Sequence, residues 1–503
     1  MKTLKSATLD GFEALSVEVE ATFSKALPAF SIVGLGNTAI QESKDRIKSA
    51  LLANDFKFPP LKITINLSPS EAYKSGSHFD LPIALLIALQ NEKIDFGEFY
   101  CFGELGLDGK LKDTDSIFVL ALSLVKNQKI KKILVPLQSI EKISTLPNLE
   151  VYGISNLSEA IEMFRTGNFE NYKFEDSKEI SQNFMIIENQ KYFVNQNFEL
   201  DFSQIKGQEA AKRAALICAA GNHNMLLEGS PGCGKSMIAK RLPFVMPPMS
   251  LDEILEKAKL ESLEGKVPTF LPTRIFRSPH HSSTRASIFG GGSGTAKIGE
   301  VAISSNGILF FDELPHFTKN ILEAMREPLE DYRILISRVN NKIEYKTKFL
   351  FVCAMNPCPC GNLLSNQKEC RCTELEIKRY KNRLSEPFLD RIDLHIQMAQ
   401  TSEDDKSTIS SHQMQQKVFD AFCMQKMRGQ KDFNGKLSDE EIERFCIISE
   451  DLQSLLQKAA QNFGLSYRGV NKILKIARTI ADLNQAINIQ KADILEAISY
   501  RKR

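Results

Sequence analysis

The sequence predicts a multidomain α/β protein whose centre is an αβα sandwich of the P-loop type. Three observations support this prediction. A glycine-rich loop lies between an apolar strand and a helix at residues 225–242. Beta-rich and helical runs alternate across residues 201–404, as in a doubly wound parallel sheet. Residues 405–503 show helical periodicity without a β-rich run, so we expect a helical lid there.

Two further regions precede the predicted nucleotide-binding core. Residues 1–165 mix β-rich runs such as AFSIVGL and KKILVPL with helical runs such as AIQESKDRIKSALLAND, which predicts an α/β domain. Residues 166–200 are rich in Asn, Glu and Lys and lose clear periodicity. We interpret this stretch as a linker or a peripheral extension.

The composition limits the partners and the compartment. The net charge of +2 gives no global basic field, so any nucleic-acid site must be a local basic patch. The longest apolar run, LPIALLIAL, is about half a membrane span. The first residues lack the apolar core of a signal peptide, and ten cysteines in 503 residues do not form a secreted disulfide framework. We therefore expect a cytoplasmic protein with reduced thiols and no membrane partner.

The glycine-rich loop predicts a site for ATP. Its pattern, G-x4-G-K-S, stands in the strand–loop–helix context that a P-loop requires. Backbone N–H groups of such a loop surround phosphates at the positive end of the following helix. Lys235 would reach the β- and γ-phosphates, and Ser236 would ligate Mg²⁺. The residues expected to bind the nucleotide are Gly229, Ser230, Pro231, Gly232, Cys233, Gly234, Lys235 and Ser236.

Two later apolar strands end in polar residues that suit ATP hydrolysis. The strand ILFF ends at Asp312 and Glu313, where Asp312 would hold Mg²⁺ through water and Glu313 would deprotonate the attacking water. The strand FLFVCAM ends at Asn356, the sensor 1 position of AAA+ ATPases, where an amide contacts the γ-phosphate. The alternatives are two solvated carboxylates at a strand end and an ordinary turn-forming Asn.

Two arginines complete the predicted catalytic set. Arg391 lies in PFLDRIDLHI, and Arg468 opens the helical run YRGVNKILKIARTIADL. In an AAA+ ring, Arg391 would be the arginine finger that acts on a neighbouring subunit, and Arg468 would be a sensor 2 acting within its own subunit. A finger of this kind requires an oligomer. The alternative is a pair of ordinary solvated arginines.

The order of these motifs resembles that of the ComM family of magnesium-chelatase-like AAA+ proteins over nearly the full length. The matching blocks are RSPHHSSTRASIFGGGSGTAKIGEVAISSNGILFFDELPHF, REPLEDYRILISR, AMNPCPCG, NRLSEPFLDRIDLHI and LSYRGVNKILKIARTIADL. The resemblance implies a hexameric ring ATPase that acts on DNA and promotes branch migration during natural transformation. It also implies that the core is similar to the magnesium chelatase ATPase subunit and to minichromosome maintenance helicases.

Two basic segments are candidates for DNA contact. Residues 274–294 precede the Asp312–Glu313 strand, at the place where the family's relatives carry an insert. Residues 332–349 form two β-rich runs around Asn340–Asn341, which predicts a hairpin. Lys and Arg side chains there would contact phosphates without reading sequence. The alternative is a solvated edge hairpin whose lysines prevent aggregation. The candidate contacts are Arg277, Arg285, Arg338, Lys342, Lys346 and Lys348.

The resemblance also implies a ribosomal S5/Lon-protease-like fold for residues 1–165. The segment EAYKSGSHFDLPIALLIAL places His78 where the nucleophilic Ser of Lon-type proteases would stand. Lys74 and Ser77 are present, but in the wrong register. A hydroxyl without its positioned base is not a nucleophile, so proteolysis is disfavoured. The domain is interpreted as a scaffold or as a second surface for DNA or a partner.

Four cysteines follow the strand that ends at Asn356. Cys358, Cys360, Cys370 and Cys372 form the pattern C-x-C-x9-C-x-C. Two cysteine pairs joined by a short loop can close a tetrahedral site, and thiolates are preferred ligands of structural Zn²⁺. Each pair has one residue between its cysteines, which is fewer than the usual two to four. The alternatives are four free thiols or two disulfides.

Taken together, the sequence predicts an ATP- and Mg²⁺-dependent ring ATPase, expected to be a hexamer, that acts on branched DNA. The alternative is a magnesium-chelatase-type ATPase that remodels a protein partner. Both share the same catalytic motifs, so only the basic hairpin and the full-length resemblance favour DNA.

Overall fold

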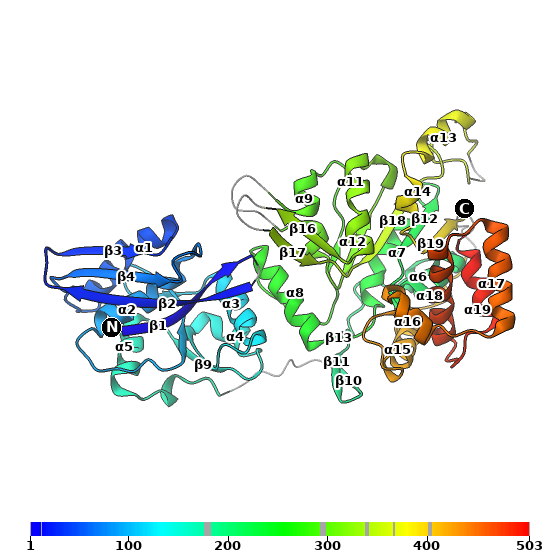
Figure 1. The fold of residues 1–503 in the computed structure, drawn as a ribbon. Helices are drawn as coiled ribbons and strands as arrows, with labels where there is room; N and C mark the ends of the chain where they lie inside the picture. The colour runs from blue at the N-terminus through cyan, green and yellow to red at the C-terminus, as the bar shows by residue number, and fades with distance from the viewer. Residues whose placement is uncertain are drawn as a thin grey trace. The chain divides into compact units, whose positions relative to one another are not determined.

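The computed structural model describes residues 2–11, 13–175, 183–291, 298–337, 342–365, 368–400 and 405–501 (Figure 1). The chain divides into two compact units. The first comprises Met1–Ser181 with Ala258–Phe270, and the second comprises Gln182–Lys257 with Leu271–Arg503. Both mix helices with sheets that contain parallel strands, in agreement with the α/β prediction.

The first unit is built on a seven-stranded sheet with the order β3-β4-β2-β1-β5-β8-β9. The first two strands pair antiparallel, and β5, β8 and β9 continue the sheet in parallel. Alternate residues of the strands, such as Ile63, Ile65 and Leu67, face the core. The strands are β1 (Lys2–Asp10), β2 (Glu13–Ser24), β3 (Ala29–Val33), β4 (Lys62–Ser68), β5 (Phe99–Cys101), β8 (Lys132–Pro136) and β9 (Glu150–Ile154). The main helices are α1 (Thr38–Ala53), α2 (Asp80–Ala88), α3 (Asp115–Lys126) and α5 (Leu157–Thr166).

The long apolar run of the sequence is a core helix of this unit. From Asp80 to Ile87, every side chain of α2 is buried. Among the described residues, no helix combines the length and the apolar character needed to cross a membrane.

The polar residues of the protease-like segment each have other partners in the first unit. His78 is buried, with Nε2 2.8 Å from the Ala7 carbonyl oxygen and Nδ1 3.3 Å from the Ser116 hydroxyl. Burial lowers the pKa of His78 to about 4, so the ring is neutral at physiological pH. Lys74 donates to the Pro69 carbonyl, and Ser77 donates to Glu104. The Lys74 ammonium and the Ser77 hydroxyl therefore bond to different partners and not to each other.

A five-stranded parallel sheet forms the centre of the second unit, in the order β14-β15-β18-β12-β19. The three middle strands are fully buried, as expected for a parallel sheet covered on both faces. The strands are β12 (Met225–Gly229), β14 (Phe276–Arg277), β15 (Ile308–Phe311), β18 (Leu350–Met355) and β19 (Leu394–Met398). The helices before residue 400 include α6 (Glu209–Gly221), α7 (Lys235–Arg241), α8 (Leu251–Leu263), α9 (Arg285–Phe289), α10 (Glu300–Ile303), α11 (Lys319–Ala324), α12 (Arg326–Glu330), α13 (Glu374–Lys381) and α14 (Glu386–Leu389). The end of α8, from Ala258, belongs to the first unit.

The C-terminal helices share one hydrophobic core with this sheet. Ile476 and Ile480 of α18 lie in the same buried cluster as Leu227 of β12 and Ile396 of β19. His223, which follows α6, places Nε2 2.7 Å from the Thr479 hydroxyl of α18. The helices are α15 (Ser411–Met427), α16 (Asp439–Phe445), α17 (Glu450–Phe463), α18 (Tyr467–Leu483) and α19 (Lys491–Ser499). The first turn of α18 is thereby held at a fixed place beside the core.

Part of the stretch that shows no periodicity in the sequence is a β-hairpin. Strands β10 (Phe184–Ile187) and β11 (Gln190–Phe193) pair antiparallel, and β11 also pairs with β13 (Met249–Ser250). Glu188 and Asn189 form the tight turn with φ values of 47° and 63°. Left-handed conformation at both central residues is the mark of a type I′ turn. Each strand has four residues, which is too few for an alternating apolar pattern to stand out in the sequence. Glu is also not a usual residue in such a turn.

Candidate functional site

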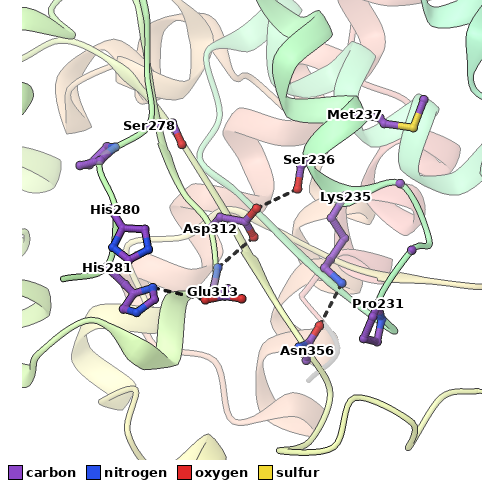
Figure 2. Close-up of a pocket in the computed structure, with 13 residues that line it drawn as sticks. Pro231, Lys235, Ser236, Met237, Ser278, His280, His281, Asp312, Glu313 and Asn356 are labelled. Atoms are coloured by element: carbon purple, nitrogen blue, oxygen red, sulfur yellow. Dashed lines mark hydrogen bonds and ion pairs between the residues drawn. The ribbon is translucent and has the colours of Figure 1, made fainter. Parts of the chain in front are cut away.

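A cavity of about 680 Å³ lies at the carboxyl edge of the central sheet of the second unit (Figure 2). Strands β12, β15 and β18 are neighbours and parallel, so the residues that follow each of them meet at this edge. The cavity is lined by Pro231, Gly232, Gly234, Lys235, Ser236, Met237, Ser278, Pro279, His280, His281, Asp312, Glu313 and Asn356.

The loop after β12 has the conformation that its glycines permit. Gly232 and Gly234 have φ values of 81° and 94°, a region that side-chain-bearing residues rarely adopt. Lys235 opens α7 and folds back over the loop, where its Nζ lies 2.6 Å from the Gly229 carbonyl and 3.1 Å from Asn356 Oδ1. Burial lowers the pKa of Lys235, and the neighbouring Asp312 opposes that shift. The structure thus brings the predicted P-loop lysine and sensor residue together.

The two acidic residues after β15 have different surroundings. Asp312 Oδ2 accepts a hydrogen bond of 2.8 Å from the Ser236 hydroxyl, and its Oδ1 accepts one of 2.9 Å from the Glu313 N–H. Glu313 adopts a left-handed backbone with a φ of 52°. A hydroxyl beside a carboxylate offers the hard oxygen donors that Mg²⁺ prefers. Ser236 and Asp312 therefore fit the predicted metal site.

His281 is a member of the site that the motifs do not identify. Its Nδ1 lies 3.3 Å from Glu313 Oε2, and its ring lies 4.1 Å from that of His280 between centroids (Figure 2). His281 follows β14, and β14 pairs with β15, the strand that leads to Glu313. This pairing brings the segment that carries the histidine beside the carboxylate. The order of the motifs in the sequence does not predict a contact between His281 and Glu313.

The two predicted catalytic arginines meet each other outside the P-loop cavity. Arg391 Nη2 donates to Glu330 Oε2, and Arg468 Nη1 lies 2.7 Å from Glu330 Oε1. All three line a second cavity of about 540 Å³. Neither arginine is among the described residues that line the P-loop cavity. The packing of α18 therefore places Arg468 beside Arg391 and not beside Lys235 of its own chain.

Glu330 keeps its charge between these arginines. Burial alone would raise the pKa of the Glu330 carboxyl, but the hydrogen bond from Arg391 and the charges of both arginines lower it overall. The sequence does not single out this residue, since one Glu in REPLEDY carries no motif.

A buried ionic network supports the loop that carries Arg391. Asp393 accepts hydrogen bonds of 2.8 Å from the Asn224 N–H and from Lys472 Nζ of α18. Asn224 Nδ2 in turn donates to the Arg391 carbonyl at 3.0 Å. Burial would raise the pKa of Asp393, but the surrounding lysines and His223 depress it strongly. Burial also lowers the pKa of Lys436, which hydrogen-bonds to Asn224, to about 8.

The four cysteines gather after Asn356. The sulfur atoms all lie within 4.8 Å of one another, and those of Cys358, Cys360 and Cys370 are 3.4, 3.6 and 3.7 Å apart. Tetrahedral Zn²⁺ with bonds of about 2.3 Å would hold its sulfurs about 3.8 Å apart. Hydrogen bonds from the backbone N–H groups of Asn362 and Arg371 lower the pKa of Cys360 to about 6. For Cys370 and Cys372, backbone hydrogen bonds that lower the pKa are outweighed by burial and by the neighbouring thiols, which raise it. The cluster therefore fits a structural metal in its spacing.

The cysteine loop also packs against the P-loop. A Cβ atom on Gly361 would lie 2.6 Å from Pro231 Cδ, and Gly361 has a φ of 79°. The close approach and the left-handed backbone both require glycine here. The cysteine cluster is thus physically joined to the loop that would hold phosphates.

The hairpin predicted for residues 332–349 is confirmed. Strand β16 (Arg333–Ser337) pairs antiparallel with β17 (Lys342–Lys346), with Arg333 opposite Lys346 and Leu335 opposite Glu344. Lys346 is exposed, whereas Lys348 bonds to Asp432 at 2.7 Å. Lys342 lies in β17, but its side chain and all of Arg338 fall outside the described residues.

The other basic segment is only partly available for a ligand. Arg277 forms a two-point ion pair with Glu300, with N···O distances of 2.5 and 2.8 Å. Arg285 is exposed at the start of α9, with its guanidinium 6.0 Å from the Phe289 ring. Arg274 is buried and bonded to Glu253 and to backbone carbonyls. Of these arginines, Arg285 is the one placed for contact with a large ligand.

The contact between Gly361 and Pro231 makes a first prediction. We expect Gly361→Ala to loosen the P-loop, because the added methyl group cannot fit against Pro231. Hydrogen exchange of the amides of Ser230 and of residues 232–234, followed by mass spectrometry, should become about tenfold faster. Gly429→Ala is the matched control, since Gly429 has a φ of 73° but nothing within 4 Å of an added Cβ. Equal effects of the two changes at the P-loop would contradict this contact.

Comparison with known proteins agrees with this architecture. The family profile described as "Magnesium chelatase, subunit ChlI" matches residues 201–406. "Subunit ChlI of Mg-chelatase" matches residues 19–139, and "Magnesium chelatase, subunit ChlI C-terminal" matches residues 408–501. The matches therefore extend through the P-loop core and both flanking regions.

Full-length relatives are found in several bacteria. The chain is 36% identical over 503 residues to the competence protein ComM of Haemophilus influenzae, covering 98% of this chain and 95% of that protein. It is 36% identical over 501 residues to the uncharacterized protein YifB of Escherichia coli, with the same coverage. It is 31% identical over 511 residues to the uncharacterized protein Rv2897c of Mycobacterium tuberculosis, covering 99% and 98%. The resemblance inferred from the motif blocks is confirmed: this chain belongs to the ComM branch of the magnesium-chelatase ChlI family.

Proposed function

We propose that this protein is an ATP-hydrolysing ring motor that acts on DNA. The observation that carries the ATPase part is the convergence of five polar side chains on one cavity from three neighbouring strands. Those side chains are Lys235, Ser236, Asp312, Glu313 and Asn356. Membership in a magnesium-chelatase-like ATPase family supports the same chemistry.

Each residue of the cavity has a role in this proposal. Backbone N–H groups of Gly232–Ser236 and the Lys235 ammonium bind the phosphates. Ser236 and Asp312 hold Mg²⁺, which when bound neutralises charge on the phosphates. Glu313 accepts a proton from the attacking water, and Asn356 orients the water against the γ-phosphate. His281 fixes the direction of the Glu313 carboxylate through their 3.3 Å contact.

In this proposal Arg391 keeps its predicted role as an arginine finger for a neighbouring subunit. Arg468 is assigned to the same neighbour, in place of the sensor 2 role expected within its own subunit. The two guanidinium groups share Glu330 and lie away from the P-loop cavity of their own chain. Arginines that reach a γ-phosphate stabilise the charge of the transition state. A complete site then needs residues from two chains. We therefore propose that the protein forms a homo-oligomeric ring, and that this ring is a hexamer.

The DNA part rests on the family and on the exposed basic residues. The resemblance to ComM implies branch migration of recombination intermediates during natural transformation. The paired strands of residues 333–346, with exposed Lys346, and the exposed Arg285 would contact phosphates as sequence-independent charges. The chelatase profiles favour the alternative function, remodelling of a protein partner by the same ATPase. That alternative predicts no response to DNA.

The catalytic roles predict distinct effects of two substitutions. Lys235→Ala should abolish ATP binding, because the loop loses its phosphate-binding charge. Glu313→Gln should keep ATP binding but lower the hydrolysis rate by about 100-fold or more, since the general base is lost. Nucleotide titration and steady-state phosphate release measure the two effects. Lys240→Ala, on the exposed face of the same helix α7, should change neither. Hydrolysis by Glu313→Gln at the wild-type rate would contradict the assignment.

The proposed DNA function is tested by ATP hydrolysis with no DNA, single-stranded DNA, duplex and a four-way junction. We expect several-fold stimulation, strongest with the junction, and its loss when Lys342, Lys346 and Lys348 are changed to Gln. The dependence of DNA affinity on salt should weaken in the same variant, because fewer counterions are released. A charge-matched control changes the exposed Lys129 and Lys131 and the partly exposed Lys132 to Gln. A rate indifferent to every DNA would favour remodelling of a protein partner.

We also propose that the cysteine cluster holds structural Zn²⁺. The sulfur spacing and the contact between Gly361 and Pro231 support a role in stiffening the loop beside Asn356. Elemental analysis of the purified protein should find about one zinc per chain. Cys370→Ser with Cys372→Ser should remove it, whereas Cys423→Ser, at a half-buried thiol outside the cluster, should not. Unchanged metal content in the double variant would rule out this site.

A further inference from the structure

Glu330 lies where the arginine pair meets the base of the basic hairpin. Its two carboxylate oxygens are divided between the arginines, with Oε2 accepting from Arg391 and Oε1 2.7 Å from Arg468. Glu330 is also the last residue of α12, and the hairpin strand β16 begins three residues later at Arg333. One residue therefore joins the arginines to the start of the hairpin.

The base of the hairpin is fastened to the helix that carries Glu330. The Thr347 N–H donates to the Tyr332 carbonyl at 2.8 Å, which closes the hairpin just below Arg333 and Lys346. The Thr347 hydroxyl donates to the Pro328 carbonyl of α12 at 3.3 Å. Tyr332 itself adopts a φ of 52°, an uncommon conformation for a bulky residue. A displacement of the hairpin would thus be transmitted directly to α12 and to Glu330.

The arginines are held by Glu330 to different degrees. The Arg391 side chain is 13% exposed, and it also donates to the Pro387 carbonyl at 2.5 Å. The Arg468 side chain is 70% exposed, and Glu330 is the carboxylate it contacts among the described residues. Without Glu330, two cationic side chains would stand side by side and repel each other. The carboxylate therefore fixes where both guanidinium groups point.

The same carboxylate competes with a phosphate for the arginines. Guanidinium groups bind carboxylate and phosphate oxygens through the same planar N–H donors. While Arg391 and Arg468 are bonded to Glu330, part of their donor set is not available to a γ-phosphate on the next subunit. Exchange of the carboxylate for the phosphate requires Glu330 to withdraw.

We propose that Glu330 restrains Arg391 and Arg468 and releases them when DNA displaces the hairpin, so that ATP hydrolysis depends on DNA. The restraint rests on the proposed role of the two arginines in ATP hydrolysis, and its release rests on the proposed DNA function. The restraint is tested without DNA, and the release is tested with DNA. Glu330 acts through the arginines and is a positioning residue.

Glu330→Gln tests the restraint, because Gln keeps the size of the side chain and loses the charge. In the assembled, DNA-free protein we expect the hydrolysis rate to rise about fivefold, the effect of removing two partly exposed ion pairs. Addition of a four-way junction should then raise the rate little further, while binding of the labelled junction stays unchanged. Glu327→Gln is the matched control, since Glu327 is exposed on the same helix α12, three residues away. It should behave as the unmodified protein.

Combination with the arginine variants separates restraint from general loosening of the fold. If the gain passes through the arginines, Glu330→Gln should give no gain in an Arg391→Ala or Arg468→Ala background, a strongly non-additive result. A rate that falls equally with and without DNA would overturn the restraint, because it would mean that Glu330 only supports the local structure. A rate equal to that of Glu327→Gln would overturn it as well. If the unmodified protein shows no response to DNA, the DNA function fails, but the DNA-free gain still tests the restraint by itself.

Discussion

The parallel pairing of β12, β15 and β18 is the constraint on which the site depends. Parallel strands end at one edge, so the residues after each strand must meet there. The P-loop follows β12, Asp312 and Glu313 follow β15, and Asn356 follows β18. Asp312 is 76 positions from Ser236 and Asn356 is 121 positions from Lys235, yet hydrogen bonds of 2.8 and 3.1 Å connect these pairs. The ends of β15 and β18 carry the acidic and amide groups, and the end of β12 supplies the backbone N–H groups of the loop and the lysine.

Burial of apolar side chains and one ionic network set the position of the C-terminal helices against the central sheet. Apolar residues of α18 share a core with the central sheet, which fixes where the first turn of that helix lies. Lys472 of α18 then reaches Asp393, beside the loop of Arg391. Removing charges from water is costly unless they are paired, so this buried network has few alternative arrangements. The consequence is that Arg468 and Arg391, from distant parts of the chain, stand together on Glu330 and not at the P-loop.

Several contacts link the peripheral segments to the residues proposed for ATP hydrolysis. His281, at the start of the segment that leads to Arg285, touches Glu313. Gly361, between the cysteine pairs, packs on Pro231 of the P-loop. Glu330, at the base of the hairpin, holds the arginines. Each segment proposed to meet DNA or metal thus has one short connection to a residue proposed to act in ATP hydrolysis. In the proposed function, such connections would let a bound ligand control hydrolysis.

The sequence alone determined the family, the α/β class and the motifs, because these depend on local patterns. A P-loop requires particular glycines, and apolar runs that end in Asp312–Glu313 or Asn356 are visible without a structure. The hairpin around Asn340–Asn341 was also predicted, since turn residues between β-rich runs are a local signal. Tertiary structure decided which distant side chains meet. The pairing of β14 with β15 brings His281 to Glu313, and the packing of α18 brings Arg468 to Glu330. Neither contact leaves a trace in spacing, because a sheet order and a helix packing angle are set by the burial of the whole core.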